Sequence, residues 1–247
     1  KRTEFTRLSR WHLLAFVAVL VFVRAFFYRE IGPAVNWTPQ LDLGAIAPAF
    51  RANNFSQQLL FSVLSLLRAL AVFYFWLLVL SVINRRSANP DPLQRLLWLQ
   101  LGKSAHWPLA LKLAAPVVLS GLLWLAFYPL LAHWEVINWA ASKWHLAGQC
   151  LVVGLGIFLS LKYLLPAFLL LHLISSYVYL GNSPIWEFVS NTSRNLMTPL
   201  TGETLRVGKV DVAPLLGLVL IGLLFFFPVP WGIRALLKHF ELTIWPG

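Results

Sequence analysis

Five apolar runs constrain this chain more than any other feature. They cover residues 11–28, 59–83, 107–132, 146–180 and 213–231. Each holds roughly 18 residues or more, enough helix to cross a hydrocarbon core about 30 Å thick at about 1.5 Å per residue. Charged residues make up 12% of the chain, whereas an average soluble domain has about 25%. The sequence therefore predicts an all-α, polytopic membrane protein of about five spans.

The basic residues are spread between these runs and are not gathered in one domain. The formal net charge is +11, from 20 Lys and Arg against 9 Asp and Glu. The segments on the side of the N-terminus hold more of the basic residues than those on the opposite side. Because Lys and Arg accumulate on the cytoplasmic side and contact anionic lipids there, we expect an inside N-terminus and no nucleic-acid partner.

The region from residue 59 to residue 231 contains an internal repeat. A shift of 94 positions places Leu67 on Leu161, Arg68 on Lys162, Leu77 on Leu171, Ser81 on Ser175 and Pro90 on Pro184. Each half is then a long apolar helix with one cation, an inner loop that opens at a proline, and a second span. We expect repeats at 59–133 and 145–231, preceded by a span and a long outer segment (1–58) and followed by a tail (232–247).

The outer segment, residues 29–58, is unlike either a span or a linker. Gly and Pro interrupt it too often for a spanning helix, and it is too apolar for a free linker. We expect it to lie against the outer membrane surface or a neighbouring protein.

Both inner loops carry the pattern of a short amphipathic helix. Asn89 and Ser183 are placed to cap these helices, with Pro90 and Pro184 in the first turn. In the first loop, Leu93, Leu96, Leu97 and Leu101 recur at helical spacing before Gly102. Trp98 and Trp186 are expected at headgroup depth. Membrane anchoring and a docking face for a partner subunit are both open.

The second half resembles the YggT family of bacterial inner-membrane proteins, which has plastid relatives. The resemblance rests on Asn182, Pro184, Pro199, Arg206, Gly208, Asp211 and Pro214. In the first half, Asn89 and Pro90 match, but no Gly-x-Asp-x-x-Pro precedes Leu109. The resemblance implies a multi-pass protein of the bacterial cytoplasmic membrane that serves assembly of membrane complexes and performs no defined reaction. It also makes Arg206 and Asp211 candidate partner- or lipid-binding residues.

Asp211 also has a purely structural explanation. Pro214 can begin a helix, and a carboxylate just before a helix N-terminus is stabilised by the helix dipole by about 0.3 to 1 kcal/mol. Arg206 and Lys209 are near enough in sequence to neutralise it. Capping and a role in proton or ion handling are both open for Asp211, and also for Asp42 in the outer segment.

Arg68 and Lys162 are the two cations that interrupt long apolar runs. Each precedes the proline of its inner loop by 22 residues, or about 33 Å of helix, close to one bilayer thickness. This spacing suggests depth markers whose stems reach the outer headgroups. The alternative is contact with an anion, a lipid phosphate or a neighbouring subunit.

Catalytic constellations are not evident in the sequence. All acidic residues lie outside the apolar runs, and Cys150 is the single cysteine, so neither a carboxylate pair nor a thiolate cluster is expected within the membrane. His172 is a weak candidate haem ligand, with interhelical hydrogen bonding as the alternative. We expect no enzyme activity, no metal and no catalytic cofactor, while a bound lipid or pigment stays open.

Two functions fit these patterns. The first is a non-catalytic accessory, structural or assembly subunit of a larger bacterial membrane complex, which contacts other integral membrane subunits and anionic lipids through aromatic-rich helices. The second is a small transporter or channel in which Arg68 and Lys162 meet an anionic solute. Candidate binding residues are Arg68, Lys162, Trp98, Trp186, Arg206 and Asp211.

Overall fold

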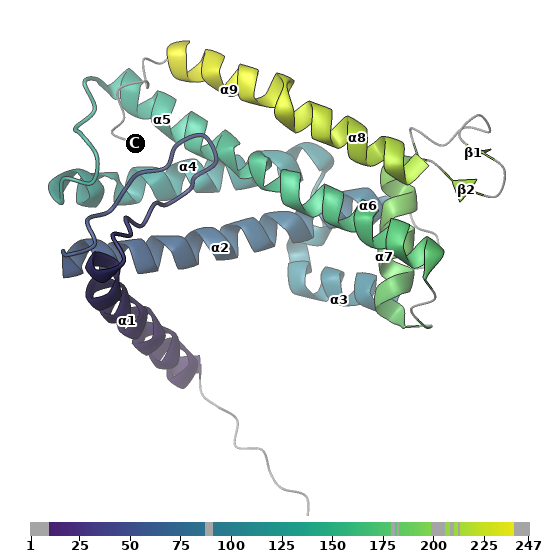
Figure 1. Ribbon diagram of the computed structural model, residues 1–247, viewed down its shortest axis with the longest axis horizontal. Helices are drawn as coiled ribbons and strands as arrows, with labels where there is room; N and C mark the ends of the chain where they lie inside the picture. Colours follow the sequence, from purple (N-terminus) through teal and green to yellow (C-terminus); the bar gives the residue numbers. More distant parts are fainter. Residues whose placement is uncertain are drawn as a thin grey trace, which may run out of the picture.

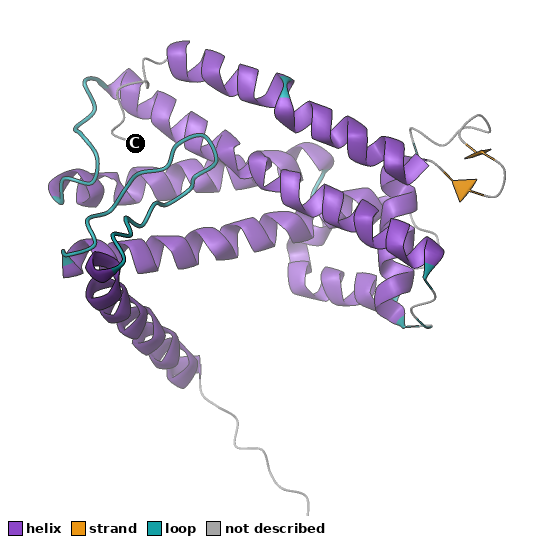
Figure 2. Ribbon diagram, in the orientation of Figure 1, coloured by secondary structure: helices purple, strands orange, loops and turns teal. Residues whose placement is uncertain are grey.

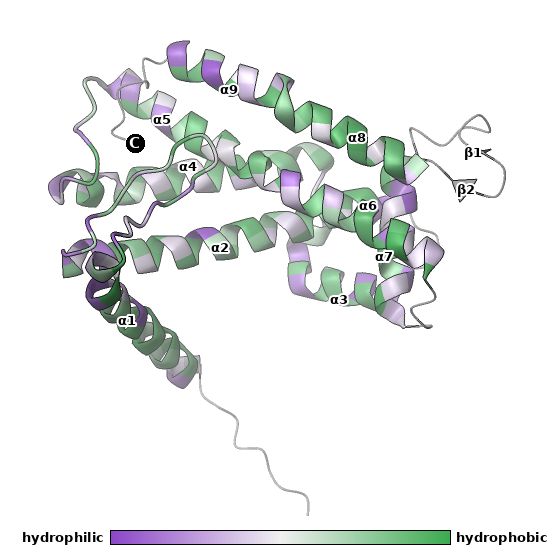
Figure 3. Ribbon diagram, viewed as in Figure 1, coloured by the Kyte–Doolittle hydropathy of each residue, from purple (hydrophilic) through white to green (hydrophobic). Residues whose placement is uncertain are grey.

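Five membrane-length helical segments dominate the computed structural model, which describes residues 10–86, 91–178, 181, 183–198, 206–207, 210–211 and 213–239. They are α1 (Arg10–Ala34), α2 (Phe55–Ile83), α4 (Leu109–His133), the continuous unit of α5 (Lys143–Gly156), η3 (Ile157–Ser160) and α6 (Leu161–Tyr177), and the pair α8 (Ala213–Phe226) and α9 (Pro228–His239). Figure 3 shows that apolar residues cover these helices on most sides. The predicted all-α polytopic fold is confirmed.

Two spans continue several residues beyond the C-terminal ends of their apolar runs. Helix α1 continues through Arg29 and Glu30 to Ala34, and the last span continues through α9 to His239, where a tail was expected. Both extensions are helical and contain charged residues. A helix can continue beyond the hydrocarbon core because its internal backbone hydrogen bonds also form in water.

The spans lie side by side, except for α1, which runs away from the others toward its N-terminal end (Figure 1). Two short helices, α3 (Pro92–Leu101) and α7 (Pro184–Met197), pack together at one end of the bundle, which we call the inner end. The order span, short helix, span therefore occurs twice: α2, α3, α4 and then α5–α6, α7, α8. A two-stranded hairpin, β1 (Arg206–Val207) and β2 (Val210–Asp211), precedes α8.

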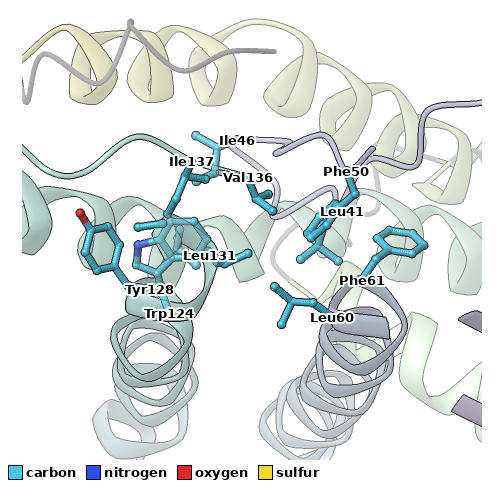
Figure 4. Packing of buried hydrophobic residues seen from close by; sticks show 12 residues of the cluster. Leu41, Ile46, Phe50, Leu60, Phe61, Trp124, Tyr128, Leu131, Val136 and Ile137 are labelled. Atoms are coloured by element: carbon cyan, nitrogen blue, oxygen red, sulfur yellow. The ribbon is translucent and has the colours of Figure 1, made fainter. Parts of the chain in front are cut away.

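The segment between α1 and α2 folds back into the bundle. We call residues 39–50 the outer hairpin; Gln40 and Ala49 form a β-bridge, and Figure 2 shows the loop crossing the helices before α2 begins. Leu41, Ile46 and Phe50 are buried against side chains of α2, α4 and α5 (Figure 4). The expectation that this segment lies on the membrane surface or on a neighbour was wrong for the hairpin, because its apolar side chains are buried within its own chain.

Hydrogen bonds account for the polar backbone of the outer hairpin. The Leu41 and Leu43 N–H groups donate to the carbonyls of Pro48 and Ile46 at 3.0 and 2.8 Å, and Phe50 N–H donates to Pro39 at 2.9 Å. Non-helical backbone at membrane depth is tolerated only where protein covers and satisfies it. This internal pairing is what allows a loop to lie among the spans.

Two glutamines at the start of α2 anchor the base of the hairpin. Gln57 is 2% exposed and Gln58 0%. Gln57 accepts from Arg51 N–H at 2.7 Å and donates to the Trp134 carbonyl at 2.7 Å, and Gln58 donates to the Arg51 carbonyl at 3.0 Å. These bonds join the hairpin, α2 and the end of α4.

The tip of the hairpin touches the middle of the α5–α6 span, backbone against backbone. Gly44 has φ +89°, and a Cβ there would lie 2.4 Å from the Gly156 carbonyl oxygen, while a Cβ on Gly156 would lie 2.2 Å from the Leu43 oxygen. The same pattern brings α4 and α5 together, because a Cβ on Gly154 would lie 2.6 Å from the Val117 oxygen. Small residues allow this close approach, as in other membrane helix pairs.

Replacing Gly156 by Ala tests the contact with the hairpin. We expect a loss of stability of about 1–3 kcal/mol, because the new methyl group displaces the hairpin backbone. Thermal unfolding in detergent would measure it. Gly222→Ala is the matched control, because a Cβ there meets no atom within 4 Å, and it should leave the midpoint equal or slightly higher. Equal midpoints for Gly156→Ala and the original chain would contradict the packing.

The fold also predicts which loops share a side of the membrane. In a chain with Cys150 replaced, single cysteines at Asn53 and Gln100 should react with a membrane-impermeant maleimide from opposite sides, because α2 separates the hairpin end from α3. Both side chains are exposed. Reaction of both positions from the same side would contradict this topology.

Candidate functional site

Arg68 and Lys162, the two cations singled out in the sequence, line the same cavity. It has a volume of about 310 Å³ and lies between α2, η3, α6 and the hairpin tip. The residues that characterise it are Arg68, Lys162, Asp42, Ser160, Trp76 and Tyr163. The structure thus joins one cation from each repeat in a single site.

Arg68 has an acidic neighbour from the outer hairpin. Its Nη2 lies 3.8 Å from Asp42 Oδ1, and the side chains are 24% and 61% exposed. Asp42 Oδ1 also accepts the Gly44 N–H at 2.7 Å, which holds the carboxylate at the tip. The helix-capping role expected for Asp42 was wrong, because its oxygen satisfies a turn of the hairpin and faces a cation.

Both cations lie deeper than the depth-marker interpretation requires. That interpretation counted 22 helical residues back from Pro90 and Pro184, but α2 ends at Ile83 and α6 at Tyr177. Each cation therefore precedes its helix end by 15 residues, or about 22 Å. Arg68 also follows Phe55, the start of α2, by 13 residues. It lies near the middle of α2, and a position next to the outer headgroups does not fit.

Three neutral donors around the cavity are already used. Trp76 Nε1 donates to Ser160 Oγ at 3.0 Å, while Ser160 Oγ donates to the Ile157 carbonyl at 2.7 Å. Ser65 Oγ donates to the Ser62 carbonyl at 3.1 Å. The donors left to meet a ligand are consequently the two cationic groups and the hydroxyl group of Tyr163.

Lys162 is exposed at the side of the bundle. Its Nζ lies 4.9 Å from the centroid of the Tyr163 ring, which is also largely exposed. A cation over an aromatic face keeps part of its stabilisation without a counter-ion. The ammonium group is therefore held close to the cavity and remains accessible from the membrane.

The inner end is held by a cluster of side-chain amides. Asn84 Nδ2 donates to Thr192 Oγ1 at 2.9 Å, its Oδ1 accepts from Asn195 Nδ2 at 2.9 Å, and its carbonyl accepts from Gln94 Nε2 at 2.8 Å. Asn84 is 3% exposed. Through this one residue the end of α2 holds both α3 and α7.

The first inner helix begins two residues later than expected. Its cap is Asp91 and its first residue Pro92, whereas Asn89 and Pro90 lie outside the described residues. Asp91 Oδ2 accepts from Asn191 Nδ2 of α7 at 2.6 Å, so the carboxylate links the two inner helices instead of capping its own. In the second loop, Ser183 stands at the N-cap position of α7 without a side-chain capping hydrogen bond. Pro184 in the first turn of α7 and Gly102 as the end of α3 are confirmed.

The two inner helices bury one face and leave the other open. On α3, Leu97 and Leu101 face the protein, while Leu96 and Leu99 are exposed. Trp98 lies on the exposed side and Trp186 is half-buried. The predicted leucine stripe is thus divided between the protein and its surroundings, because Gln94 takes part of the buried face.

The family-like residues lie at the β-hairpin before α8. Arg206 and Asp211 are cross-strand partners in the antiparallel register, and Asp211 lies two residues before Ala213, the first residue of α8. Asn182, Pro199, Gly208 and Lys209 lie outside the described residues. Pro214 is buried in the first turn of α8, as its sequence position predicts.

The residues considered for metal or cofactor binding lie apart in the described part of the chain. No group of three His, Cys, Asp or Glu that could hold a metal is found there. His172 is half-buried on α6 and does not line the Arg68 cavity. Cys150 packs at the close contact of α5 with Gly121 of α4.

Comparisons with protein-family models, curated proteins and solved structures found no match for this chain.

Several residues that organise the site were missed by sequence reasoning. Asp42 was not paired with Arg68, and the roles of Gln57, Gln58 and Asn84 were not recognised. A usable signal did exist for the glutamines, because two adjacent amides at the start of an apolar run need partners once they are buried. Lys112 is a further missed cation: it is 7% exposed at the inner end of α4, and its Nζ donates to Ser81 Oγ at 2.8 Å.

Asn84→Ala tests the amide cluster. It should lower stability by about 1–3 kcal/mol, because buried partners lose their hydrogen bonds. A double-mutant cycle with Thr192→Val, measured by unfolding in detergent, should give a coupling of about 0.5–3 kcal/mol. The same cycle between Asn53→Ala, at an exposed position, and Thr192→Val serves as the control and should give none. Additive effects of Asn84→Ala and Thr192→Val would contradict the bond.

Proposed function

We propose that this protein is a non-catalytic accessory subunit of a larger membrane protein complex, and that α1 provides the contact with its partner. The observation that carries the proposal is the poor coverage of α1. In its most hydrophobic window 6% of the residues are buried, compared with 17 to 28% in the other four spans.

Helix α1 is held near its outer end. Phe22 packs on Phe55 with ring centroids 5.3 Å apart, and the Arg24 guanidinium lies 5.0 and 5.6 Å from the ring centroids of Tyr28 and Phe61. Farther toward the inner end, Trp11, Leu13, Phe16 and Val19 are all more than half exposed. The helix therefore leaves the bundle with an apolar surface on all sides (Figures 1 and 3).

A second transmembrane protein fits the exposed face of α1. Aromatic side chains supply large contact areas at protein interfaces, and a face of α1 that points away from the buried Ala25 presents Phe16, Val23 and Phe27. The resemblance to YggT-like proteins also supports the role of an accessory subunit. The proposal places the chain in a bacterial cytoplasmic membrane with its N-terminus inside.

Transport of an anion is the second candidate, favoured by the shared cavity of Arg68 and Lys162. Toward the inner end, however, the spans close on one another through Phe75, Leu78 and Leu164. Trp76 and Ser160 are also joined across the bundle. This closure favours a binding site over a path.

Purification in mild detergent followed by quantitative mass spectrometry tests the accessory role. The original chain should retain a partner membrane protein at fixed stoichiometry. Phe16→Leu combined with Phe27→Leu should reduce that retention about tenfold or more, because aromatic anchors carry much of the energy of an interface, while leucine keeps the helix apolar enough to insert. Phe226→Leu with Phe227→Leu, at equally exposed positions on the last span, is the control and should retain the partner.

Transport would replace this proposal if the chain purified alone and moved anions across liposome membranes. In that case, Arg68→Ala and Lys162→Ala should abolish the flux while the α1 variants leave it unchanged.

A further inference from the structure

The cavity between Arg68 and Lys162 has unsatisfied positive charge. In the described part of the chain, the acid closest to the Arg68 guanidinium is Asp42, at 3.8 Å, which exceeds hydrogen-bond distance. Lys162 meets the face of Tyr163, which is uncharged. A guanidinium at mid-span depth with one loosely placed carboxylate neighbour is costly unless a further acceptor is present.

We propose that this cavity binds a lipid through a singly charged anionic group, a phosphodiester or a carboxylate. The charge of the lining sets the class of ligand: two cations and one carboxylate leave an excess of one positive charge. A monoanion neutralises that excess, whereas a phosphomonoester, which can carry a second charge, leaves a negative one. The donors of Ser65, Trp76 and Ser160 are occupied, so the groups left to donate are the two cations and the Tyr163 hydroxyl.

The surroundings favour an amphiphile over a free ion. A second, narrow cavity of about 70 Å³ adjoins the first, and Arg68 and Val72 line both. Its other walls are almost entirely apolar, among them Leu41, Leu64 and Trp124. Exposed Ala69, Lys162 and Tyr163 form the lateral rim of the first cavity. A lipid can therefore enter from the bilayer with its charged group between the cations and an apolar portion toward the second cavity.

The outer hairpin contributes the selectivity of the site. Asp42 is fixed by its bond to the Gly44 N–H, and Gly44 is fixed by its contact with Gly156. The Asp42 carboxylate is thus held in place and reduces the net positive charge of the cavity to one. No residue of α1 lines the cavity, so lipid binding is separable from the contact with a partner subunit.

The experiment compares lipid retention in nanodiscs of phosphatidylcholine that also contain phosphatidylglycerol, oleate or phosphatidic acid, with native mass spectrometry of the released protein. The original chain should retain phosphatidylglycerol or oleate in preference to phosphatidylcholine, and whichever is retained identifies the phosphodiester or the carboxylate. Arg68→Gln and Lys162→Gln should each lower that retention about ten- to a hundredfold, the size expected for a lost charge-assisted contact. Arg68→Lys keeps the charge and should retain most of the lipid, which separates binding from folding.

Asp42→Asn is the sharpest variant, because the amide oxygen can still accept the Gly44 N–H while the negative charge is lost. It should raise retention of phosphatidic acid relative to phosphatidylglycerol. Arg51→Gln removes an exposed outer cation that pairs with Glu135 outside this cavity. It is the control and should leave both the lipid retention and the lipid preference unchanged.

Three results would overturn the proposal. One is equal lipid retention by the original chain, Arg68→Gln and Lys162→Gln. Another is displacement of the lipid by inorganic phosphate at equal concentration, which would make the site one for free anions. The third is an unchanged lipid preference in Asp42→Asn. If the α1 variants lose the partner but retain the lipid, that result bears on the accessory role alone and does not contradict the lipid site.

Discussion

Satisfaction of backbone hydrogen bonds inside the membrane is the constraint on which the outer half of this protein depends. A loop among the spans has no water to hydrogen-bond its backbone. The outer hairpin therefore pairs its own backbone groups, and the side chains of Gln57 and Gln58 bond the backbone of Arg51 at its base. Those glutamines also reach α4 through the Trp134 carbonyl. Because the hairpin needs α2, α4 and α5 around it, it fixes the spacing of these helices, and the cavity beside Arg68 is a consequence of that spacing.

The middle and the inner end of the bundle are held by different chemistry. Near mid-span, glycines allow backbone contact between the hairpin and α5, and glycine also sets the approach of α5 to α4. At the inner end, the contacts are between side chains, with Asn84 joined to α3 and α7 and Asp91 joined to Asn191. Backbone contact through glycine tolerates little change of side chain, whereas an amide cluster depends on complete pairing of its donors and acceptors.

The spans could be predicted from the sequence because length and hydropathy are local properties. The start of α7 and the end of α3 could also be predicted, because Ser183, Pro184 and Gly102 lie at the ends of these helices. The hairpin could not be predicted, because its apolar residues fit a surface segment as well as a buried one. The contact with Gly156 decides that the hairpin is buried, and Gly156 is distant from the hairpin in the sequence. Arg68 and Lys162 could be recognised as charges in apolar runs. Their shared cavity and the approach of Asp42 could not, because both depend on the tertiary packing of separate segments.

The contact of Gly44 with Gly156 also bears on the order in which the chain is assembled. The hairpin is synthesised before α2, α3 and α4, and its docking surface on α5 appears after all of them. Until α5 has entered the bilayer, the hairpin tip lacks its contact with Gly156, so its backbone is not fully covered at membrane depth and the hairpin must wait in the aqueous phase. Arg68 is then inserted without Asp42 beside it. Biogenesis of this protein is therefore a two-step event: insertion of the spans comes first, and the loop moves in as the closing step.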